Sequence, residues 1–273
     1  MKRFPAIATA LGAAAVILFS LLPFLWFLDT SLKTPAEVTA IPPSLLPAGS
    51  LRFYETVFRQ YGIVLFARNS LIVAGSTTVI TLAISVLAAY ALARLKLRRA
   101  GLFLGALLLV SLFPQISIAG PVWTLLQRAG LLNTFPGLII PYVTLNLPLG
   151  IWVLTGFFKE LPRDLEDAAR VDGCTRVQAL FRVIIPLSAP GVFTAAILIF
   201  IYAWNEFFFA LLIMTRREYQ TLPVGIALFQ GQYTMPWGEL AAASVIATAP
   251  LVLLAFFFQR KIVRGLSAGA LKG

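Results

Sequence analysis

Long apolar runs separated by shorter polar stretches are the dominant pattern along this chain. Runs such as residues 102–110 and 193–201 are apolar on every side and lack the period-two alternation of barrel strands. An apolar run of about 20 residues is long enough for a helix to cross a bilayer. The pattern therefore predicts an all-α membrane protein with six spanning helices, at residues 7–28, 69–93, 101–126, 137–158, 191–213 and 240–258.

The composition agrees with a bilayer as the surrounding solvent. Hydrophobic residues make up 59% of the 273 positions and charged residues only 12%, with a mean hydropathy of +0.89. Soluble domains carry about 25% charged residues. The first apolar run follows Lys2 and Arg3 and ends in Trp26-Phe27-Leu28-Asp29, without a small-residue cleavage site. We therefore expect a retained first helix, not a signal peptide.

The charge is strongly basic, at +11 with no histidine. Lysines and arginines gather at the ends of the apolar runs, which favours span flanks over a nucleic-acid surface. With the N-terminus inside, the inner segments hold 15 of the 22 basic residues and the outer segments seven. This bias predicts both termini in the cytoplasm. The lone Cys174 excludes an internal disulfide, and no metal site is expected.

The inner loop at residues 159–190 contains five of the eleven acidic residues. Asp164, after Pro162, is expected to cap a short helix that Gly173 ends in a left-handed turn. A capping box at 175–178 begins a second helix. Val177, Leu180, Phe181 and Ile184 share one face of this second helix, directed at the bundle or the bilayer surface.

The first of these helices presents carboxylates beside small residues, at Glu166-Asp167-Ala168-Ala169. Alanines allow close approach and carboxylates offer ion pairs, so the loop is predicted to dock a soluble partner with an arginine-lined cleft. The outer loops at 30–68 and 214–239 are also long, and a short helix is expected near residues 53–59. Whether these outer loops bind a partner or only connect spans is open.

Residues 165–173, Leu-Glu-Asp-Ala-Ala-Arg-Val-Asp-Gly, followed by Pro186-Leu187 and Pro190, resemble the EAA loop of ABC-importer permeases. The resemblance implies a type I ABC-importer permease fold whose EAA coupling helix docks into a cytoplasmic ATPase. Asp167 stands where relatives most often have glutamate, so Glu166 is expected to share the contact. The residues implied in ATPase coupling are Glu166, Asp167, Ala168, Ala169, Asp172 and Gly173.

Four further segments, at 69–70, 89–94, 203–207 and 258–273, are similar to the shorter subunit of maltose/trehalose-type sugar permeases. The resemblance implies three partners: a second homologous permease, a homodimeric ATPase and an extracytoplasmic sugar-binding protein. It divides the chain into a first helix with its outer loop (1–67), a permease core (68–260) and a cytoplasmic tail (261–273). The implied ATPase-interface residues of the tail are Ser267, Gly269, Lys272 and Gly273. Those implied to contact the binding protein are Gln230, Gln232 and Tyr233.

Glu206 lies inside the fifth predicted span, where an ionised carboxylate must face a cavity or a partner. Asn205 and Glu206 are therefore candidates for the translocation pathway, and helix-to-helix hydrogen bonding is the alternative.

The sequence contains no Gly-x-x-x-x-Gly-Lys-Ser/Thr loop, so ATP and Mg²⁺ are expected on a partner chain and no cofactor on this one. The expected function is a non-enzymatic permease subunit of an ATP-driven importer for a disaccharide or oligosaccharide such as maltose or trehalose. A stand-alone secondary transporter or channel is the alternative, but ion coupling usually needs several ionisable groups within spans, and Glu206 is the only clear acidic one. A membrane enzyme would need a nucleophile–base or metal constellation that the sequence lacks.

Overall fold

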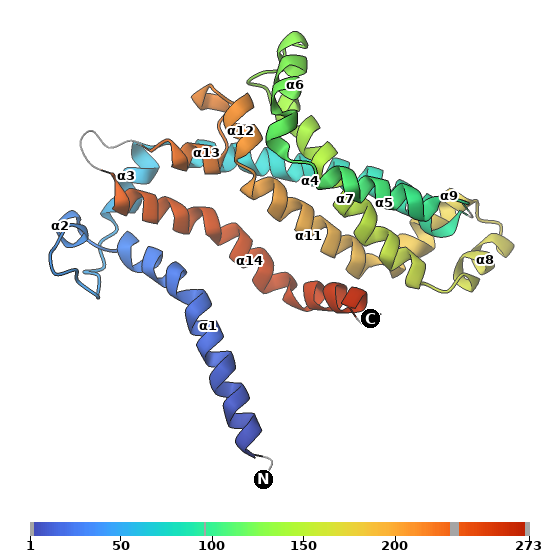
Figure 1. The fold of residues 1–273 in the computed structure, drawn as a ribbon, viewed down its shortest axis with the longest axis horizontal. Helices are drawn as coiled ribbons and strands as arrows, with labels where there is room; N and C mark the ends of the chain where they lie inside the picture. The colour runs from blue at the N-terminus through green and yellow to red at the C-terminus, as the bar shows by residue number, and fades with distance from the viewer. Residues whose placement is uncertain (1–2, 96, 230–234, 271–273) are drawn as a thin grey trace. The chain divides into compact units, whose positions relative to one another are not determined.

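The computed structural model of the chain describes residues 3–95, 97–229 and 235–270, and these residues form helices and loops without a β-strand. Four long helices carry four of the predicted apolar runs, and each contains a segment apolar and long enough to cross a bilayer. They are α1 (Arg3–Ser31), α4 (Ile63–Arg94), α7 (Phe135–Glu160) and α14 (Trp237–Ala270) (Figure 1). The predictions at these four runs are confirmed.

The other two spans are broken, where straight helices were expected. The third consists of α5 (Ala100–Ser111) and α6 (Gln115–Arg128), which meet at 88°. Pro114 lies in the break, has no N–H to donate and disfavours helical backbone at the residue before it. The fifth consists of α11 (Ala189–Asn205), which meets the preceding segment Arg176–Leu187 at 81° and is followed after a two-residue break by α12 (Phe208–Ile213). With each bent pair counted as one span, the described residues contain up to six spans, as predicted.

Shorter helices occupy the connections between the spans. The helix expected near residues 53–59 is present as α3, one residue longer than predicted. The short elements are α2 (Pro35–Val38), α3 (Arg52–Arg59), α8 (Asp164–Val171), α9 (Arg176–Ala179), the π-helical η1 (Leu180–Ile184), α10 (Ile185–Leu187), the 3-10 helix η2 (Arg217–Tyr219) and α13 (Leu222–Ala227).

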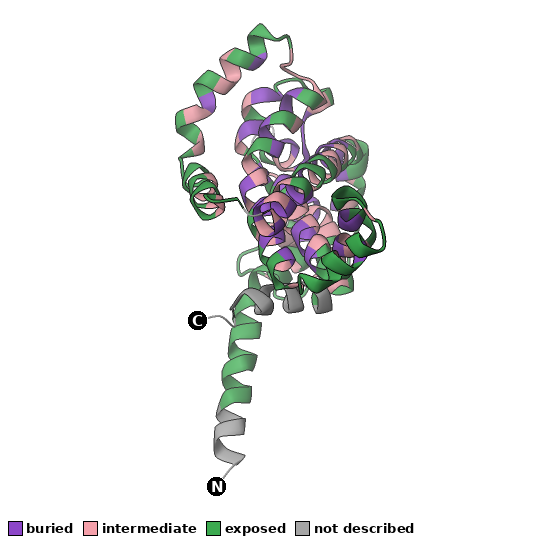
Figure 2. Ribbon diagram, turned by 90° about the vertical axis from the view of Figure 1, so that its right-hand side faces the viewer, coloured by how far each residue is buried: buried purple, intermediate pink, exposed green. Residues whose placement is uncertain are grey.

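The chain forms two compact units, and the first combines Met1–Leu65 with Gly225–Pro250. Within it, the rings of Tyr61 and Phe229 stack with their centroids 4.1 Å apart. Gly238 at the start of α14 lies against the ring of Phe53, and any side chain there would collide with that ring. By contrast, α1 is exposed at residues 9–28 (Figure 2). A helix that is apolar all round and unpacked by its own unit is suited to contact lipid or another membrane chain.

The second unit, Phe66–Val224 with Leu251–Gly273, contains the candidate site. Helix α7 is its centre and packs extensively against α11 and α5. The helices approach closely at glycines: a Cβ on Gly150 would meet the side chain of Ser85 in α4, and one on Gly191 would meet the ring of Phe157. Close packing at small residues is the usual way in which membrane helices associate. The division of the chain at 67 and 260 by topology remains a prediction.

Candidate functional site

The predicted docking residues lie in the α7–α11 loop, residues 161–188, which has the expected two-helix structure. Gly173 has a φ of +86° and ends α8 in the left-handed region, as predicted. The capping box is present: the Thr175 amide donates to Gln178 Oε1 at 2.8 Å, and the Gln178 amide donates to Thr175 Oγ1 at 3.3 Å. The prediction that Asp164 caps α8 is wrong. Arg163 takes the cap position without a side-chain bond, and Asp164 is the first helical residue.

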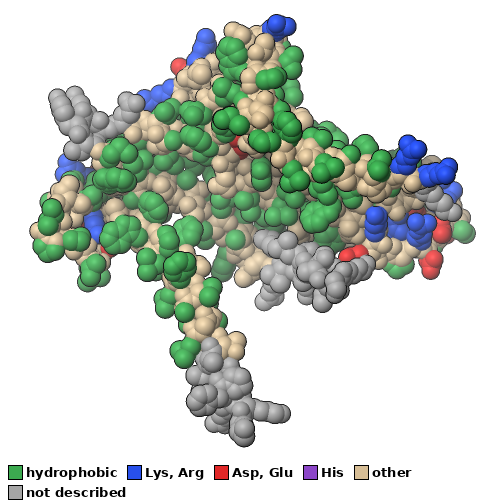
Figure 3. Space-filling view, in the orientation of Figure 1, with side chains coloured by type: hydrophobic (Ala, Val, Ile, Leu, Met, Phe, Trp, Pro, Cys, Tyr) green, Lys and Arg blue, Asp and Glu red, His purple; other side chains and the backbone are tan. Residues whose placement is uncertain are grey.

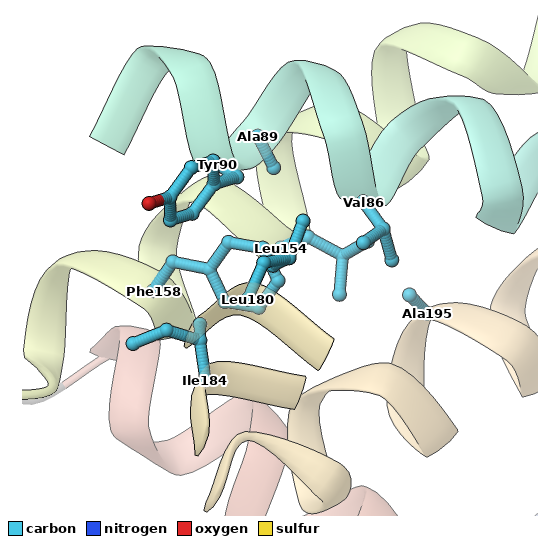
Figure 4. Packing of buried hydrophobic residues seen from close by; sticks show 8 residues of the cluster. All are labelled: Val86, Ala89, Tyr90, Leu154, Phe158, Leu180, Ile184 and Ala195. Atoms are coloured by element: carbon cyan, nitrogen blue, oxygen red, sulfur yellow. The ribbon is translucent and has the colours of Figure 1, made fainter. Parts of the chain in front are cut away.

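The second half of this loop is built into the core of the unit. Leu180 and Ile184 are 1% and 0% exposed and pack with Leu154 and Phe158 of α7 (Figure 4). The π-helical turn that carries them precedes Pro186, which cannot continue a regular helical hydrogen-bond ladder. Val177 and Phe181 are 61% and 57% exposed, so only half of the predicted apolar face packs against the bundle. The loop and the spans therefore share one hydrophobic core.

Glu166 connects α8 to the end of α4. The hydroxyl of Tyr90 donates a 2.5 Å hydrogen bond to Glu166 Oε1, and Arg94 Nε lies 3.9 Å from Oε2. Arg94 also donates through Nη2 to the carbonyl of Leu161 at 2.9 Å, so it contacts the end of α7 as well. The side chains of Arg94 and Glu166 are only 3% and 13% exposed. Glu166 is therefore engaged within the chain, by contacts to the end of α4.

The other predicted coupling residues divide by exposure. Asp167, Ala168, Asp172 and Gly173 are exposed, whereas Ala169 is buried and faces the chain's own core. The structure thus brings four of the six residues to the surface and leaves Asp167 as the free carboxylate of the Glu-Asp-Ala-Ala segment. Tyr90 lies in the segment 89–94, which the sequence distinguished only by a family resemblance, and nothing in its local pattern indicated contact with a residue 76 positions away.

A cavity of about 420 Å³ opens beside Asp167. Positive and negative side chains gather at this end of the molecule, over α8 and α9 (Figure 3). The residues that line the cavity are Arg94, Leu95, Arg163, Glu166, Asp167, Arg170 and Arg176. Three of these arginines are exposed, so the surface offers both charges to a partner, where the sequence drew attention to carboxylates alone.

Glu206 lies in the break between α11 and α12 and is 9% exposed. Its carboxylate accepts hydrogen bonds from the amides of Phe209 at 2.9 Å and Ala210 at 3.2 Å, and from the hydroxyl of Tyr142. The two amides belong to the first turn of α12, which has no earlier carbonyls to bond. These contacts favour the interpretation of Glu206 as a link between helices. Asn205 is exposed and its amide donates to the Ile201 carbonyl at 2.8 Å. A pathway role for both residues remains a prediction.

The segment that follows α12 is hydrogen-bonded to the first turns of α4. Asn69 Nδ2 donates to the carbonyls of Glu218 and Gln220 at 2.8 and 3.0 Å, and the Leu222 amide donates to Ser70 Oγ at 2.7 Å. These bonds hold the chain immediately before the predicted binding-protein contact. That contact itself, at Gln230, Gln232 and Tyr233, lies outside the described residues.

The predicted tail residues are only partly described. Ser267 and Gly269 lie in the last turns of α14, whereas Lys272 and Gly273 lie outside the described residues. In the part of the chain that the structure describes, no group of three or more histidine, cysteine or acidic side chains could hold a metal ion.

The family model for the binding-protein-dependent transport system inner membrane component matches residues 14–268. The sulfoquinovosyl glycerol transport system permease protein SmoH of Agrobacterium fabrum is 46% identical, over 96% of this chain and 93% of its own. The trehalose/maltose transport system permease protein MalG of Thermococcus litoralis is 42% identical, over 96% and 95%.

A solved structure shares the fold. In the crystal structure of a bacterial ABC transporter for import of the acidic polysaccharide alginate, one chain matches with a TM-score of 0.80 and 23% identity, over 95% of this chain and 96% of that chain. The family match covers all of the charged loop and the broken spans, and all of the long helices except the first residues of α1 and the last residues of α14. The chain belongs to the family of binding-protein-dependent transport system inner membrane components.

Proposed function

We propose that this chain is one of two permease subunits of an ATP-driven importer for a sugar. The observation that carries the proposal is the α7–α11 loop, whose exposed, charged helix α8 is bound to α4 through Glu166 and whose second half packs against α7 through the buried Leu180. A partner that moves α8 would move α4 and α7 with it. The sugar is inferred from the relatives, which are permeases for sulfoquinovosyl glycerol and for trehalose and maltose.

In this mechanism a homodimeric ATPase binds α8 from the cytoplasm, with both termini of this chain on the same side. ATP binding closes the ATPase, and the α7–α11 loop transmits that closure to the spans. A second, homologous permease completes the passage, and an extracytoplasmic binding protein delivers the sugar. ATP and Mg²⁺ belong to the ATPase, since this sequence has no phosphate-binding loop. We further assign the tail residues Ser267, Gly269, Lys272 and Gly273 to the ATPase interface, and Gln230, Gln232 and Tyr233 to the binding protein.

The test is co-purification of the ATPase with an Ala168→Trp variant. Ala168 is exposed on α8 beside Asp167, so a bulky ring there blocks close approach without entering the core. We expect the variant to lose most of the bound ATPase and most ATP-driven sugar uptake. Ala129→Trp is the matched control, because Ala129 is also exposed but follows α6 at the other end of the spans.

Two outcomes contradict the proposal. One is full ATPase binding and uptake by the Ala168→Trp variant. The other is transport of a sugar by this chain alone in liposomes, driven by an ion gradient, which supports a stand-alone secondary transporter.

A further inference from the structure

An uncharged loop in the first unit exposes large apolar side chains. Residues 38–51, called the 38–51 loop below, contain no lysine, arginine, aspartate or glutamate. Within this loop Ile41, Leu45 and Leu46 are 96%, 77% and 83% exposed. In the connection after α12, by contrast, Leu222 is only 1% exposed. Exposed apolar side chains that gather in one segment indicate contact with a membrane or another protein.

The 38–51 loop starts near the end of α1 and returns to it. The amide of Ser50 donates a hydrogen bond to the carbonyl of Leu32 at 2.8 Å. Just beyond the loop, the hydroxyl groups of Tyr54 in α3 and Ser31 in α1 share a hydrogen bond of 2.8 Å. The loop with α2 therefore lies beside the C-terminal end of α1 (Figure 1).

This end of α1 belongs at a surface of the bilayer. The apolar segment Thr9–Ser31 has 23 residues and rises about 35 Å, slightly more than the hydrocarbon core of about 30 Å. Trp26 is 52% exposed, and tryptophan is enriched where a membrane meets water. Leu32 lies only about 9 Å further along the chain direction, and the nine residues from there to Ile41 can return over that distance.

The charged side chains that precede the loop in the chain are paired or hydrogen-bonded. Lys33 Nζ lies 2.6 Å from Asp29 Oδ2, and the Lys33 side chain is only 4% exposed. The carboxylate of Glu37 accepts a hydrogen bond from the Thr34 amide at 2.7 Å. Entry of the loop into a lipid surface therefore does not bring an unpaired charge of this segment toward the acyl chains.

The backbone of the loop suits the same environment. An irregular segment that enters lipid must give up the water on its N–H groups, which is costly. Pro42, Pro43 and Pro47 have no N–H, so three of these groups are absent from the part of the loop that carries the exposed apolar side chains.

We propose that the 38–51 loop inserts Ile41, Leu45 and Leu46 into the lipid leaflet at the C-terminal end of α1, where it anchors the first unit. Apolar side chains of interfacial segments enter about 5–10 Å into the boundary between headgroups and acyl chains. Lipid is the occupant because the loop adjoins the exposed end of a spanning helix and carries no charge. A docking surface for a soluble protein has a polar rim. The proposal depends neither on the transported sugar nor on the ATPase.

The experiment places an environment-sensitive fluorophore on the loop. Cys174→Ser removes the lone cysteine, and Leu46→Cys then accepts the fluorophore NBD. The transporter, with its partner chains, is reconstituted in nanodiscs of phosphatidylethanolamine and phosphatidylglycerol, with or without a lipid that carries a doxyl quencher near the headgroup end of its acyl chain. We expect a blue-shifted emission, loss of most quenching by aqueous iodide, and quenching by the doxyl lipid.

Arg59→Cys in the same Cys174→Ser protein is the control. Arg59 lies in α3 of the same unit, and its side chain is 78% exposed and paired only with the exposed Glu55. A fluorophore there should be quenched by iodide and not by the doxyl lipid.

A charge introduced into the loop tests whether its apolar side chains hold it in lipid. In a Leu45→Cys protein labelled in the same way, Leu46→Asp should restore quenching by iodide and abolish quenching by the doxyl lipid, because an ionised carboxylate is costly there. Leu46→Ala keeps the loop uncharged and should change the quenching less. Both positions are exposed, so neither change disturbs the core.

Four results overturn the proposal. Equal iodide quenching of the Leu46→Cys and Arg59→Cys proteins places the loop in water. Protection from both quenchers assigns the loop to a partner chain, and protection that appears only after the sugar-loaded binding protein is added assigns it to that protein. Doxyl quenching that persists in the Leu46→Asp variant shows that the apolar side chains do not hold the loop. None of these measurements requires transport, so a failure of sugar uptake affects only the proposed function.

Discussion

Two glutamates in the second unit each accept a hydrogen bond from a tyrosine of a neighbouring long helix, yet their surroundings differ. The Glu206 carboxylate accepts hydrogen bonds from the hydroxyl of Tyr142 in α7 and from two backbone amides of α12. The Glu166 carboxylate accepts a hydrogen bond from the hydroxyl of Tyr90 in α4. Arg94 Nε lies 3.9 Å from Glu166 Oε2, too far for a hydrogen bond. Along α7 the two regions are separated by 19 residues, from Tyr142 to Leu161, or about 28 Å of helix.

The difference concerns what each carboxylate holds. Glu206 lies in the break between α11 and α12, and its carboxylate is held there by backbone amides of α12. Glu166 links the exposed helix α8, in which Ala169 is the one buried residue, to α4, and it does so through side chains alone. Backbone contacts within a break favour a rigid joint. Side-chain contacts between two helices can lengthen or exchange, so the Glu166 region is suited to transmit a movement and the Glu206 region to withstand it.

The largest loss of stability should come from Glu206→Ala, which leaves two buried amides without their acceptor and leaves the Tyr142 hydroxyl only the backbone carbonyl of residue 206, at 3.3 Å. At about 1–3 kcal/mol for each unsatisfied group, and with partial relaxation, we expect a loss of about 3–5 kcal/mol in the free energy of unfolding. The measurement is thermal unfolding of the purified protein in detergent. Glu206→Gln keeps one side-chain acceptor, so its free energy of unfolding should fall less. Glu218→Ala is the control, because Glu218 is exposed and its removal should change the free energy of unfolding little. Equal melting temperatures for Glu206→Ala and wild type would show that the break is not held by this carboxylate.

A smaller loss of stability is expected from variants of the contact between Glu166 and Tyr90. Tyr90→Phe and Glu166→Gln each weaken one charge-assisted hydrogen bond, worth about 1.5–3 kcal/mol. Because both changes affect the same contact, the double variant should be little less stable than either single one. Thermal unfolding of the four proteins measures this non-additivity. Additive losses would contradict a direct link between α4 and α8.

The same variants separate the two adjacent carboxylates by function. Tyr90→Phe and Glu166→Gln should retain the ATPase on co-purification but take up less sugar per ATP, because the link inside the chain is loosened. Asp167→Asn should instead weaken ATPase binding, since Asp167 is exposed and has no such link. If Glu166→Gln releases the ATPase as strongly as Asp167→Asn, Glu166 contacts the partner directly.

The smallest loss of stability should come from Gly173→Ala, at the end of α8. A φ of +86° disfavours any residue with a Cβ by about 1–2 kcal/mol, and the strain is confined to the end of α8. The amide of Cys174 donates to the Ala169 carbonyl at 3.0 Å, so the variant should increase the rate at which maleimide labels Cys174. Gly156→Ala is the control, because Gly156 lies in α7 with open space around its Cα and should leave the rate unchanged. Equal labelling rates would mean that α8 does not depend on this turn.

Local features of the fold followed from the sequence where the cause was local. The Thr175–Gln178 capping box and the Gly173 turn involve residues at most five positions apart, and both were predicted correctly. The cap at Asp164 was predicted wrongly, because the two successive polar residues Arg163 and Asp164 can each take the cap position. The breaks at Pro114 and at Glu206 were also missed. A run that is apolar on every side looks the same whether the helix continues through it or bends.

The sequence by itself determined that this is a membrane protein with six apolar runs, a charged loop before the fifth run and no Gly-x-x-x-x-Gly-Lys-Ser/Thr motif. Those properties depend on residue type and spacing, which are read directly along the chain. Only the tertiary structure decided that Glu166 is engaged with Tyr90 while Asp167 is exposed, and that Glu206 is bound by Tyr142 and by two amides of α12. The physical reason is that these assignments depend on contacts between helices 60 or more residues apart, and an evenly apolar helix does not indicate which face its neighbours will cover.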